Sequence, residues 1–157
     1  MTSSLAVEQN PAAPAWPGAP FSFAGQSWQA LPQGALFWQE RSALIVADLH
    51  FEKASAFARR GQMLPPYDSR ATLDALEQAI AQTAPREIWC LGDSFHDMGA
   101  HERMTTETRE RLAKLTAGHR WTWITGNHDP QGGTHSDSRL GGISVQEAEI
   151  DGVMLRH

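Results

Sequence analysis

The sequence has 157 residues, which fits one domain with a single core and excludes two domains of full size. Hydrophobic residues make up 41% and charged residues 20%, close to the averages of globular proteins, so we expect neither a disordered chain nor a coiled coil. Thirteen Lys and Arg against eighteen Asp and Glu give a net charge of −5, which argues against a basic protein that coats nucleic acid.

Cysteine content and hydropathy indicate a compartment. The single cysteine, Cys90, cannot form an intramolecular disulfide, so we expect a reducing compartment and assign the cytoplasm. The longest apolar run, residues 43–47, is far shorter than the ~20 residues that cross a bilayer. The sequence therefore predicts no membrane partner and no secretion signal.

The N-terminal segment differs in composition from the rest. Residues 1–20 contain five alanines, four prolines and one charged residue, a composition that predicts a flexible arm. The folded domain is then expected to span residues 21–157. Within it, apolar runs at 35–39 and 43–47 flank a short polar turn and predict a hairpin.

Beyond Asp48 the pattern alternates between helices and strands, which is typical of an α/β domain with parallel pairing in its sheet. The expected helices cover residues 51–60, 69–82 and 103–117, and the expected strands cover residues 87–91, 120–124, 143–150 and 153–157. The turn pair Asp151-Gly152 separates the last two strands and predicts a tight hairpin there.

Three polar clusters follow three predicted strands. They read Asp-Leu-His at 48–50, Gly-Asp-Ser-Phe-His-Asp at 92–97 and Gly-Asn-His-Asp at 126–129. The carboxyl ends of neighbouring parallel strands meet at one edge of a sheet, so we expect these side chains to converge. Asp48 and His50 are two residues apart and can reach the same ion from an extended segment.

The chemistry of this set indicates a divalent metal site. Carboxylate and amide oxygens suit Mn²⁺ or Mg²⁺, and imidazole adds affinity for Mn²⁺, Fe²⁺ or Zn²⁺. Each short motif alone is more often a turn than a ligand set. The three motifs in this order, each after an apolar strand, favour the metal site over three separate turns.

The same motifs resemble those of the calcineurin-like metallophosphoesterases, which run D-x-H, G-D and G-N-H-D. Segments 47–53, 60–66 and 92–97 are most similar to the bacterial ligase-associated DNA damage response endonucleases. The resemblance implies a layered α/β/β/α sandwich, two divalent metal ions with Mn²⁺ first among them, and hydrolysis of phosphodiesters. It also implies DNA as the substrate and DNA ligase or helicase repair proteins as partners.

The resemblance implies metal ligands by position. Asp48 and His50 resemble ligands of the first ion, Asp93 the carboxylate between the two ions, and Asn127 a ligand of the second ion. His157 resembles the later lone histidine that also binds the second ion.

Catalytic and substrate-binding roles are also implied. His128 resembles the catalytic histidine that stabilises the charge on the reacting phosphate or protonates the leaving oxygen, and Asp129 would orient its ring. His96 resembles a histidine that assists catalysis in related repair nucleases, and a helix-capping or supporting role is an equal alternative. The basic residues after the first motif could contact substrate phosphates, although a solvated helix face is the more common role of such a run. They are Lys53, Arg59 and Arg60.

One family motif is absent from the sequence. No Gly-His-x-His occurs in it, so we expect a truncated chain that lacks C-terminal strands and two ligands. Two other functions remain open at this stage. One is a phosphatase or pyrophosphatase acting on a nucleotide or small metabolite, and the other is an inactive binding module in a repair assembly.

Overall fold

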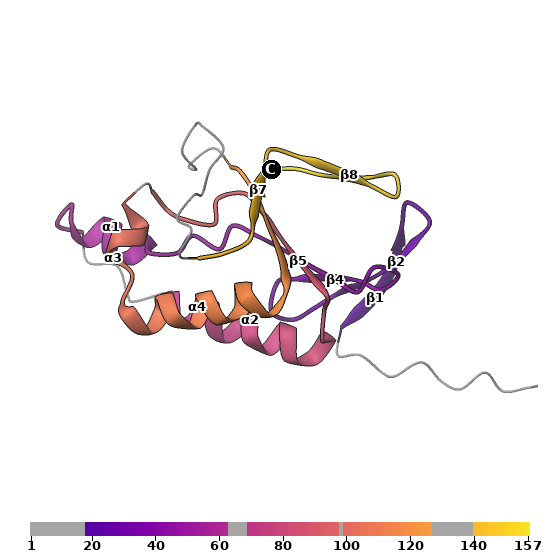
Figure 1. Ribbon diagram of the computed structural model, residues 1–157, viewed down its shortest axis with the longest axis horizontal. Coiled ribbons are helices and arrows are strands. Elements are labelled where there is room, and N and C mark those ends of the chain that lie inside the picture. The colour runs from indigo at the N-terminus through magenta and orange to yellow at the C-terminus, as the bar shows by residue number, and fades with distance from the viewer. Residues whose placement is uncertain (1–17, 63–68, 98, 127–139) are drawn as a thin grey trace, which may run out of the picture.

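The computed structural model describes residues 18–62, 69–97, 99–126 and 140–157, and a seven-stranded sheet lies at its centre (Figure 1). The strands follow chain order across the sheet, antiparallel from β1 to β4 and parallel from β4 to β7. Their bounds are β1 Ala19–Phe23, β2 Gln26–Ala30, β3 Leu36–Trp38, β4 Ala43–Ala47, β5 Glu87–Leu91, β6 Arg120–Ile124 and β7 Ile143–Val145.

Helices and a small second sheet cover the two faces of this sheet. Figure 1 shows α2 and α4 along one side and the β8–β9 hairpin on the other. The bounds are α1 Lys53–Ala58, α2 Ser69–Thr83, α3 Ala100–Arg103, α4 Thr106–Gly118, β8 Ala148–Ile150 and β9 Val153–Leu155. This arrangement of helices, large sheet and small sheet confirms the layered α/β fold expected from the sequence.

Side-chain alternation along the strands divides the interior into two apolar clusters, one on each face of the sheet. On the helix side, Leu44 and Val46 of β4 pack with residues of α2 such as Leu73. On the opposite side, Ile45 packs with Val153 and Leu155 of β9. The second cluster therefore joins the hairpin to the large sheet.

The structure corrects two of the sequence-based boundaries. The helix expected over 103–117 is α4, which begins three residues later than predicted, because α3 ends at Arg103 and the Thr105 side chain accepts a hydrogen bond from the Thr108 N–H to cap α4 (3.2 Å). The strand expected over 143–150 is two strands. Its first part is β7, parallel to β6, and its second part is β8, antiparallel to β9.

The N-terminal hairpin begins earlier than the predicted domain boundary. β1 starts at Ala19, two residues inside the segment predicted as an arm, and pairs with β2 across a turn at Ala24 and Gly25. Residues 1–17 of that predicted arm lie outside the described residues. Across the described ranges, we find no helix with the length and apolar character needed to span a bilayer.

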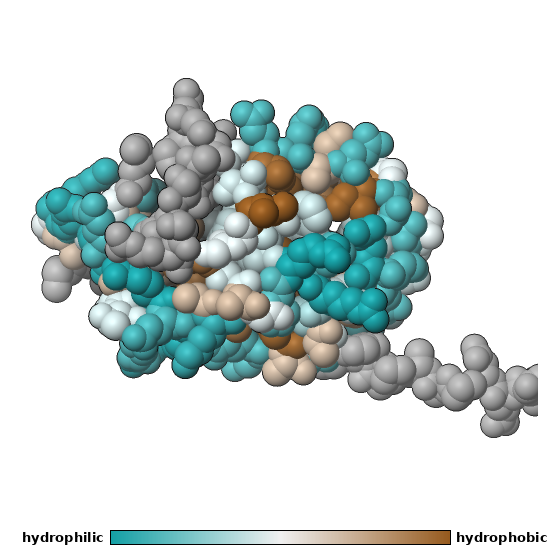
Figure 2. All heavy atoms as spheres, in the orientation of Figure 1, coloured by the Kyte–Doolittle hydropathy of each residue, from teal (hydrophilic) through white to brown (hydrophobic). Residues whose placement is uncertain are grey.

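Apolar surface remains visible outside the two clusters. Figure 2 shows it over β7 and the β8–β9 hairpin, in a face that is otherwise largely hydrophilic. The large apolar residues of these strands that stay exposed are Ile143 and Met154.

Candidate metal centre

The loops that follow β4 and β5 carry the first two polar motifs and are held together by their backbones. Parallel pairing continues past the ends of both strands, and Phe51 forms an isolated bridge with Phe95. The N–H groups donate to carbonyls as follows: Asp48 to Gly92 (3.3 Å), His50 to Asp93 (3.0 Å), Phe51 to Ser94 (2.9 Å) and His96 to Phe51 (3.0 Å). These bonds fix the two motifs side by side, as the convergence of strand ends predicts.

The backbone at these loops adopts left-handed conformations that side-chain-bearing residues seldom take. The φ angles are 51° at Asp48, 47° at His50, 65° at Glu52 and 45° at Asp93. Such conformations cost about 1–3 kcal/mol each and persist where the surroundings enforce them. Here the bridge between the buried Phe51 and Phe95, with ring centroids 5.7 Å apart, anchors the loops against the helix-side cluster.

Three side chains from three parts of the chain come together at this edge of the sheet. Asp48, Asp93 and His157 each offer a ligand atom, and these atoms lie within 4.8 Å of one another. His157 Nε2 is 3.7 Å from Asp48 Oδ1 and 3.7 Å from Asp93 Oδ2. Two donors about 2.1 Å from one ion are about 3 Å apart at right angles and about 4 Å apart when opposite, so these spacings suit metal ions held between the three side chains.

Two glycines allow this close approach. A Cβ added at Gly92 would meet the imidazole of His157, with the His157 Cβ 2.6 Å away. A Cβ added at Gly126 would meet the backbone nitrogen and Oδ1 of Asp93. The glycines that begin the second and third polar motifs therefore leave room for His157 and Asp93.

Two further histidines adjoin the cluster. His50 Nε2 lies 3.8 Å from Asp48 Oδ1. The two side chains of the Asp48-x-His50 motif therefore lie close to each other at the edge of the sheet. The His96 ring lies 6.1 Å from the His50 ring and 5.6 Å from that of Phe57, measured between centroids. His96 thus lies beside His50, on the side of Phe57.

The remaining predicted site residues form two groups. Asn127, His128 and Asp129 lie outside the described residues. Lys53, at the start of α1, and Arg59 and Arg60, just after its end, are all exposed. Because α1 is only six residues long, these three cations remain near the loop that carries His50.

A polar network behind the loops was not predicted from the sequence. The Glu52 carboxylate accepts hydrogen bonds from the hydroxyls of Ser55 and Ser69, both at 2.7 Å. Arg103 donates through Nε to Ser55 Oγ (3.0 Å) and through Nη2 to both oxygens of Asp97 (2.9 and 3.0 Å). Ser69 and Glu52 are 17 residues apart in the sequence, and Arg103 and Ser55 are 48 residues apart. No local sequence pattern therefore predicts these contacts.

Asp97 is the ionised end of this network. Burial acts to raise the pKa of Asp97, and it is outweighed by the hydrogen bonds and charge of Arg103, the Gly99 N–H and the nearby His96. The pKa of Asp97 is therefore lowered from its ordinary value. A carboxylate held in its charged form next to His96 contributes to the electrostatics of the candidate centre.

The cluster has the donor chemistry of a divalent metal site. Two carboxylates within 4.8 Å of each other repel, and a cation between them relieves that repulsion. The imidazole of His157, with that of His50 nearby, adds nitrogen donors that suit Mn²⁺, Fe²⁺ or Zn²⁺. The residues present therefore fit a bound divalent ion.

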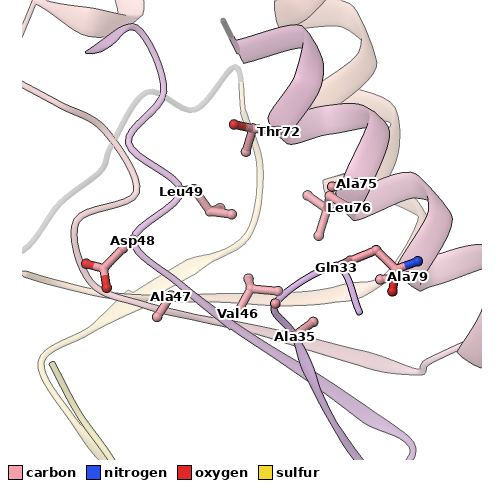
Figure 3. A pocket seen from close by; sticks show the side chains of 11 residues that line it. Gln33, Ala35, Val46, Ala47, Asp48, Leu49, Thr72, Ala75, Leu76 and Ala79 are labelled. Atoms are coloured by element: carbon pink, nitrogen blue, oxygen red, sulfur yellow. The ribbon is translucent and has the colours of Figure 1, made fainter. Parts of the chain in front are cut away.

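A separate pocket of about 220 Å³ lies on the helix side of β4. In Figure 3 the Asp48 carboxylate points away from α2, whereas Leu49 and Leu76 point toward the space between β4 and α2. The pocket is lined largely by alanine and other apolar side chains. Asp48 lines one end of the pocket, whereas Asp93 and His157 do not line it.

Comparison with known proteins identifies the family of this chain. Residues 42–151, more than half of the chain, match the family described as calcineurin-like phosphoesterase. The chain belongs to this family. Calcineurin-like phosphoesterases are metal-dependent enzymes, which agrees with the donor set of Asp48, Asp93 and His157.

Two solved structures resemble this chain to different degrees. The Pseudomonas putida nuclease MPE superposes with a TM-score of 0.70 and 27% sequence identity, over 85% of this chain and 62% of the nuclease chain. This phosphoesterase chain thus spans less than two thirds of the length of that nuclease. The protein of unknown function AQ665 from Aquifex aeolicus gives a TM-score of 0.48 and 15% identity, over 71% and 56% of the two chains. No curated protein matches the sequence.

Proposed function

We propose that this calcineurin-like phosphoesterase hydrolyses phosphodiester bonds of DNA as an endonuclease and acts in DNA repair. The observation that carries the reaction class is the convergence of Asp48, Asp93 and His157 at one edge of the sheet. The likeness to the nuclease MPE supports a nucleic-acid phosphodiester as the substrate. The resemblance of the Gly92–Asp97 segment to repair endonucleases supports the place in repair.

We assign the metal ligands to two divalent ions, with Mn²⁺ favoured by the mixture of oxygen and nitrogen donors. Asp48 and His50 would hold the first ion, Asn127 and His157 would hold the second, and Asp93 would serve as a ligand to both. When bound, such ions supply a water of lowered pKa and positive charge beside the phosphate. The ions also add +4 to a chain of net charge −5, which favours the approach of a polyanion.

The remaining site residues bind substrate and move protons. His128 donates a proton to the leaving oxygen, and Asp129 orients its ring. His96, beside His50, assists at the reacting phosphate. The exposed cations at both ends of α1 contact flanking phosphates of the DNA strand and fix its register. They are Lys53, Arg59 and Arg60.

We further propose that the protein works in the cytoplasm with DNA ligase or helicase repair proteins. Cys90 is fully buried, and burial raises the pKa of its thiol, so this cysteine is kept from reaction and serves packing. Co-purification of a tagged chain with DNA ligase from DNA-damaged cells tests the partner, and recovery without ligase in repeated trials contradicts it.

The reaction is tested by Mn²⁺-dependent hydrolysis of bis(p-nitrophenyl) phosphate and of a fluorescent DNA duplex and single strand. Asp93→Asn is expected to lower the rate at least about 100-fold, because even partners of metal ligands cost roughly 10–100-fold when removed. Asp74→Asn is the matched control, since Asp74 is an exposed residue of α2 paired with Arg111.

Each outcome selects a function. Diester hydrolysis that is lost in Asp93→Asn and kept in Asp74→Asn supports the nuclease. Hydrolysis of p-nitrophenyl phosphate or nucleotides without diester hydrolysis would replace it by a phosphatase or pyrophosphatase. A chain that is inactive on all substrates and still binds DNA or repair proteins would be the binding module.

A further inference from the structure

The backbone pairing that joins the two metal-binding loops ends at one point. The last interloop bond runs from the His96 N–H to the Phe51 carbonyl (3.0 Å). The next residues on the two sides are Glu52, which is left-handed, and Asp97. Beyond this point the two segments lead toward α1 and α3, and the further hydrogen bonds between the described parts of the loops come from side chains.

Arg103 connects the two loops where the backbone stops doing so. Its Nη2 donates to both oxygens of Asp97, in the loop after β5. Its Nε donates to Ser55 Oγ, and Ser55 in turn donates to the Glu52 carboxylate, in the loop after β4. One guanidinium therefore links Glu52, two residues after His50, with Asp97, one residue after His96.

The geometry of this link suits arginine alone. The guanidinium presents its N–H groups in a planar fork, so one face can hold a carboxylate while Nε serves a second partner. The Arg103 side chain is only 13% exposed, and a charge at that burial needs its partner. A lysine can reach one of the two partners and cannot hold both.

We propose that Arg103 is a positioning residue that holds the two metal-binding loops in register with each other. The inference rests on the proposed function, because it assigns Arg103 to the metal centre formed by these loops. Arg103 is hydrogen-bonded to none of the candidate ligands that the structure describes; its partners are Ser55 and Asp97. It acts through Asp97, the residue after His96, and through the Ser55–Glu52 pair, which restrains the left-handed turn at Glu52, two residues after His50.

Metal affinity is the direct readout of this role. Mn²⁺ binding to the full 157-residue chain is measured by the electron paramagnetic resonance signal of free Mn²⁺ during titration. Arg103→Ala is expected to weaken Mn²⁺ binding about 10–100-fold, the usual effect of removing residues that orient metal ligands. Arg103→Lys and Asp97→Asn are expected to weaken it by less, because each leaves part of the link in place.

Arg109→Ala is the matched control. Arg109 also lies beside α3, but its Nη2 donates to the backbone carbonyls of His101 and Met104 rather than to a loop side chain (3.0 and 3.3 Å). Its loss removes an arginine and two hydrogen bonds from the same region. Mn²⁺ affinity within twofold of the parent is expected for this variant, whatever its thermal unfolding temperature.

The outcomes separate this inference from the proposed function. Parent binding that falls in Arg103→Ala and in Asp97→Asn, but not in Arg109→Ala, supports the positioning role. Unchanged Mn²⁺ affinity in Arg103→Ala with a lower unfolding temperature overturns it and leaves the proposed function intact. If Arg103→Ala does not fold, unchanged affinity in both Arg103→Lys and Asp97→Asn overturns it. A parent that binds no Mn²⁺ overturns both proposals.

Discussion

The two halves of the candidate metal centre are held by different means. Asp48 and Asp93 follow central strands of a seven-stranded sheet, in loops joined by backbone hydrogen bonds and by the Arg103 network. His157 follows β9, one strand of a two-stranded hairpin whose contact with the large sheet is made through buried side chains such as Val153 and Leu155. Asp48 and Asp93 thus belong to loops of the large sheet, whereas His157 belongs to a hairpin that packs against that sheet.

This difference separates two demands on a metal site. The carboxylates must stay close together despite their repulsion, which requires a rigid backbone beneath them. The histidine must approach them from another part of the chain, which requires only that the hairpin pack in one orientation. Apolar contacts can supply that orientation because interiors are close-packed and tolerate little displacement. Substitutions in the two halves should therefore affect the site in different ways.

The largest effect is expected from loosening the hairpin. Leu155 is 4% exposed and packs in the cluster between the two sheets, so Leu155→Ala should lower the free energy of unfolding by about 2–5 kcal/mol. Mn²⁺ affinity should fall with it because His157 is two residues away. Met154→Ala, at an exposed position of the same strand, is the control in urea unfolding and Mn²⁺ titration. Equal behaviour of the two variants would contradict the apolar attachment.

A smaller effect is expected from crowding the sheet half. In Gly126→Ala the new methyl group meets Asp93, and overpacking of this kind costs about 1–3 kcal/mol. The variant should lose Mn²⁺ affinity out of proportion to its stability, since the displaced group is a candidate ligand. Gly118→Ala, where the added carbon meets nothing within 4 Å, should leave Mn²⁺ affinity unchanged. Isothermal titration of both variants decides the point.

Acid should weaken the network that supports the sheet half. The pKa of Asp97 is lowered below its ordinary value of 3.8, so its contribution to stability is present above that pH. The contribution is lost as the pH falls through the lowered pKa of the folded state. Asp97→Asn should therefore be less stable than the parent at pH 6 and approach it at pH 2 to 3. Thermal unfolding across that range would contradict the assignment if the gap were constant.

The smallest effect is expected at the hairpin turn. Arg41 Nη1 pairs with Asp151 (3.0 Å), but the Asp151 side chain is 52% exposed, and such pairs contribute about 0–1 kcal/mol. Asp151→Asn should therefore change the unfolding free energy by no more than that and leave Mn²⁺ binding unchanged. A loss comparable to that of Leu155→Ala would show that the ion pair, rather than apolar packing, holds the hairpin.

Much of the fold could be predicted from local patterns. Strands β4, β5 and β6 have the predicted bounds, because each is a short apolar run between turn residues. The division of residues 143–150 into β7 and β8 could not be predicted, since alternation does not tell which sheet a strand joins. The β1–β2 hairpin has a usable signal in Ala24-Gly25, where both residues have positive φ, but only Gly25 marks it in the sequence.

The residues of the candidate site also differ in whether the sequence predicts them. Asp48, His50 and Asp93 could be named from their places after strands, and the structure brings them together. His157 could be named only by family resemblance, since nothing local links it to residues more than 60 positions earlier. The Arg103 network could not be predicted at all, because its parts interact across helices that are themselves short and irregular in pattern.

The central claim is that the hairpin and the sheet form one metal centre, and Mn²⁺ titration of the parent, His157→Ala and Asp48→Asn tests it most directly. We expect the parent to bind Mn²⁺ and each substitution to weaken Mn²⁺ binding at this centre by at least about tenfold. Binding by His157→Ala that matches the parent, with binding lost in Asp48→Asn, would contradict it and confine the metal centre to the sheet.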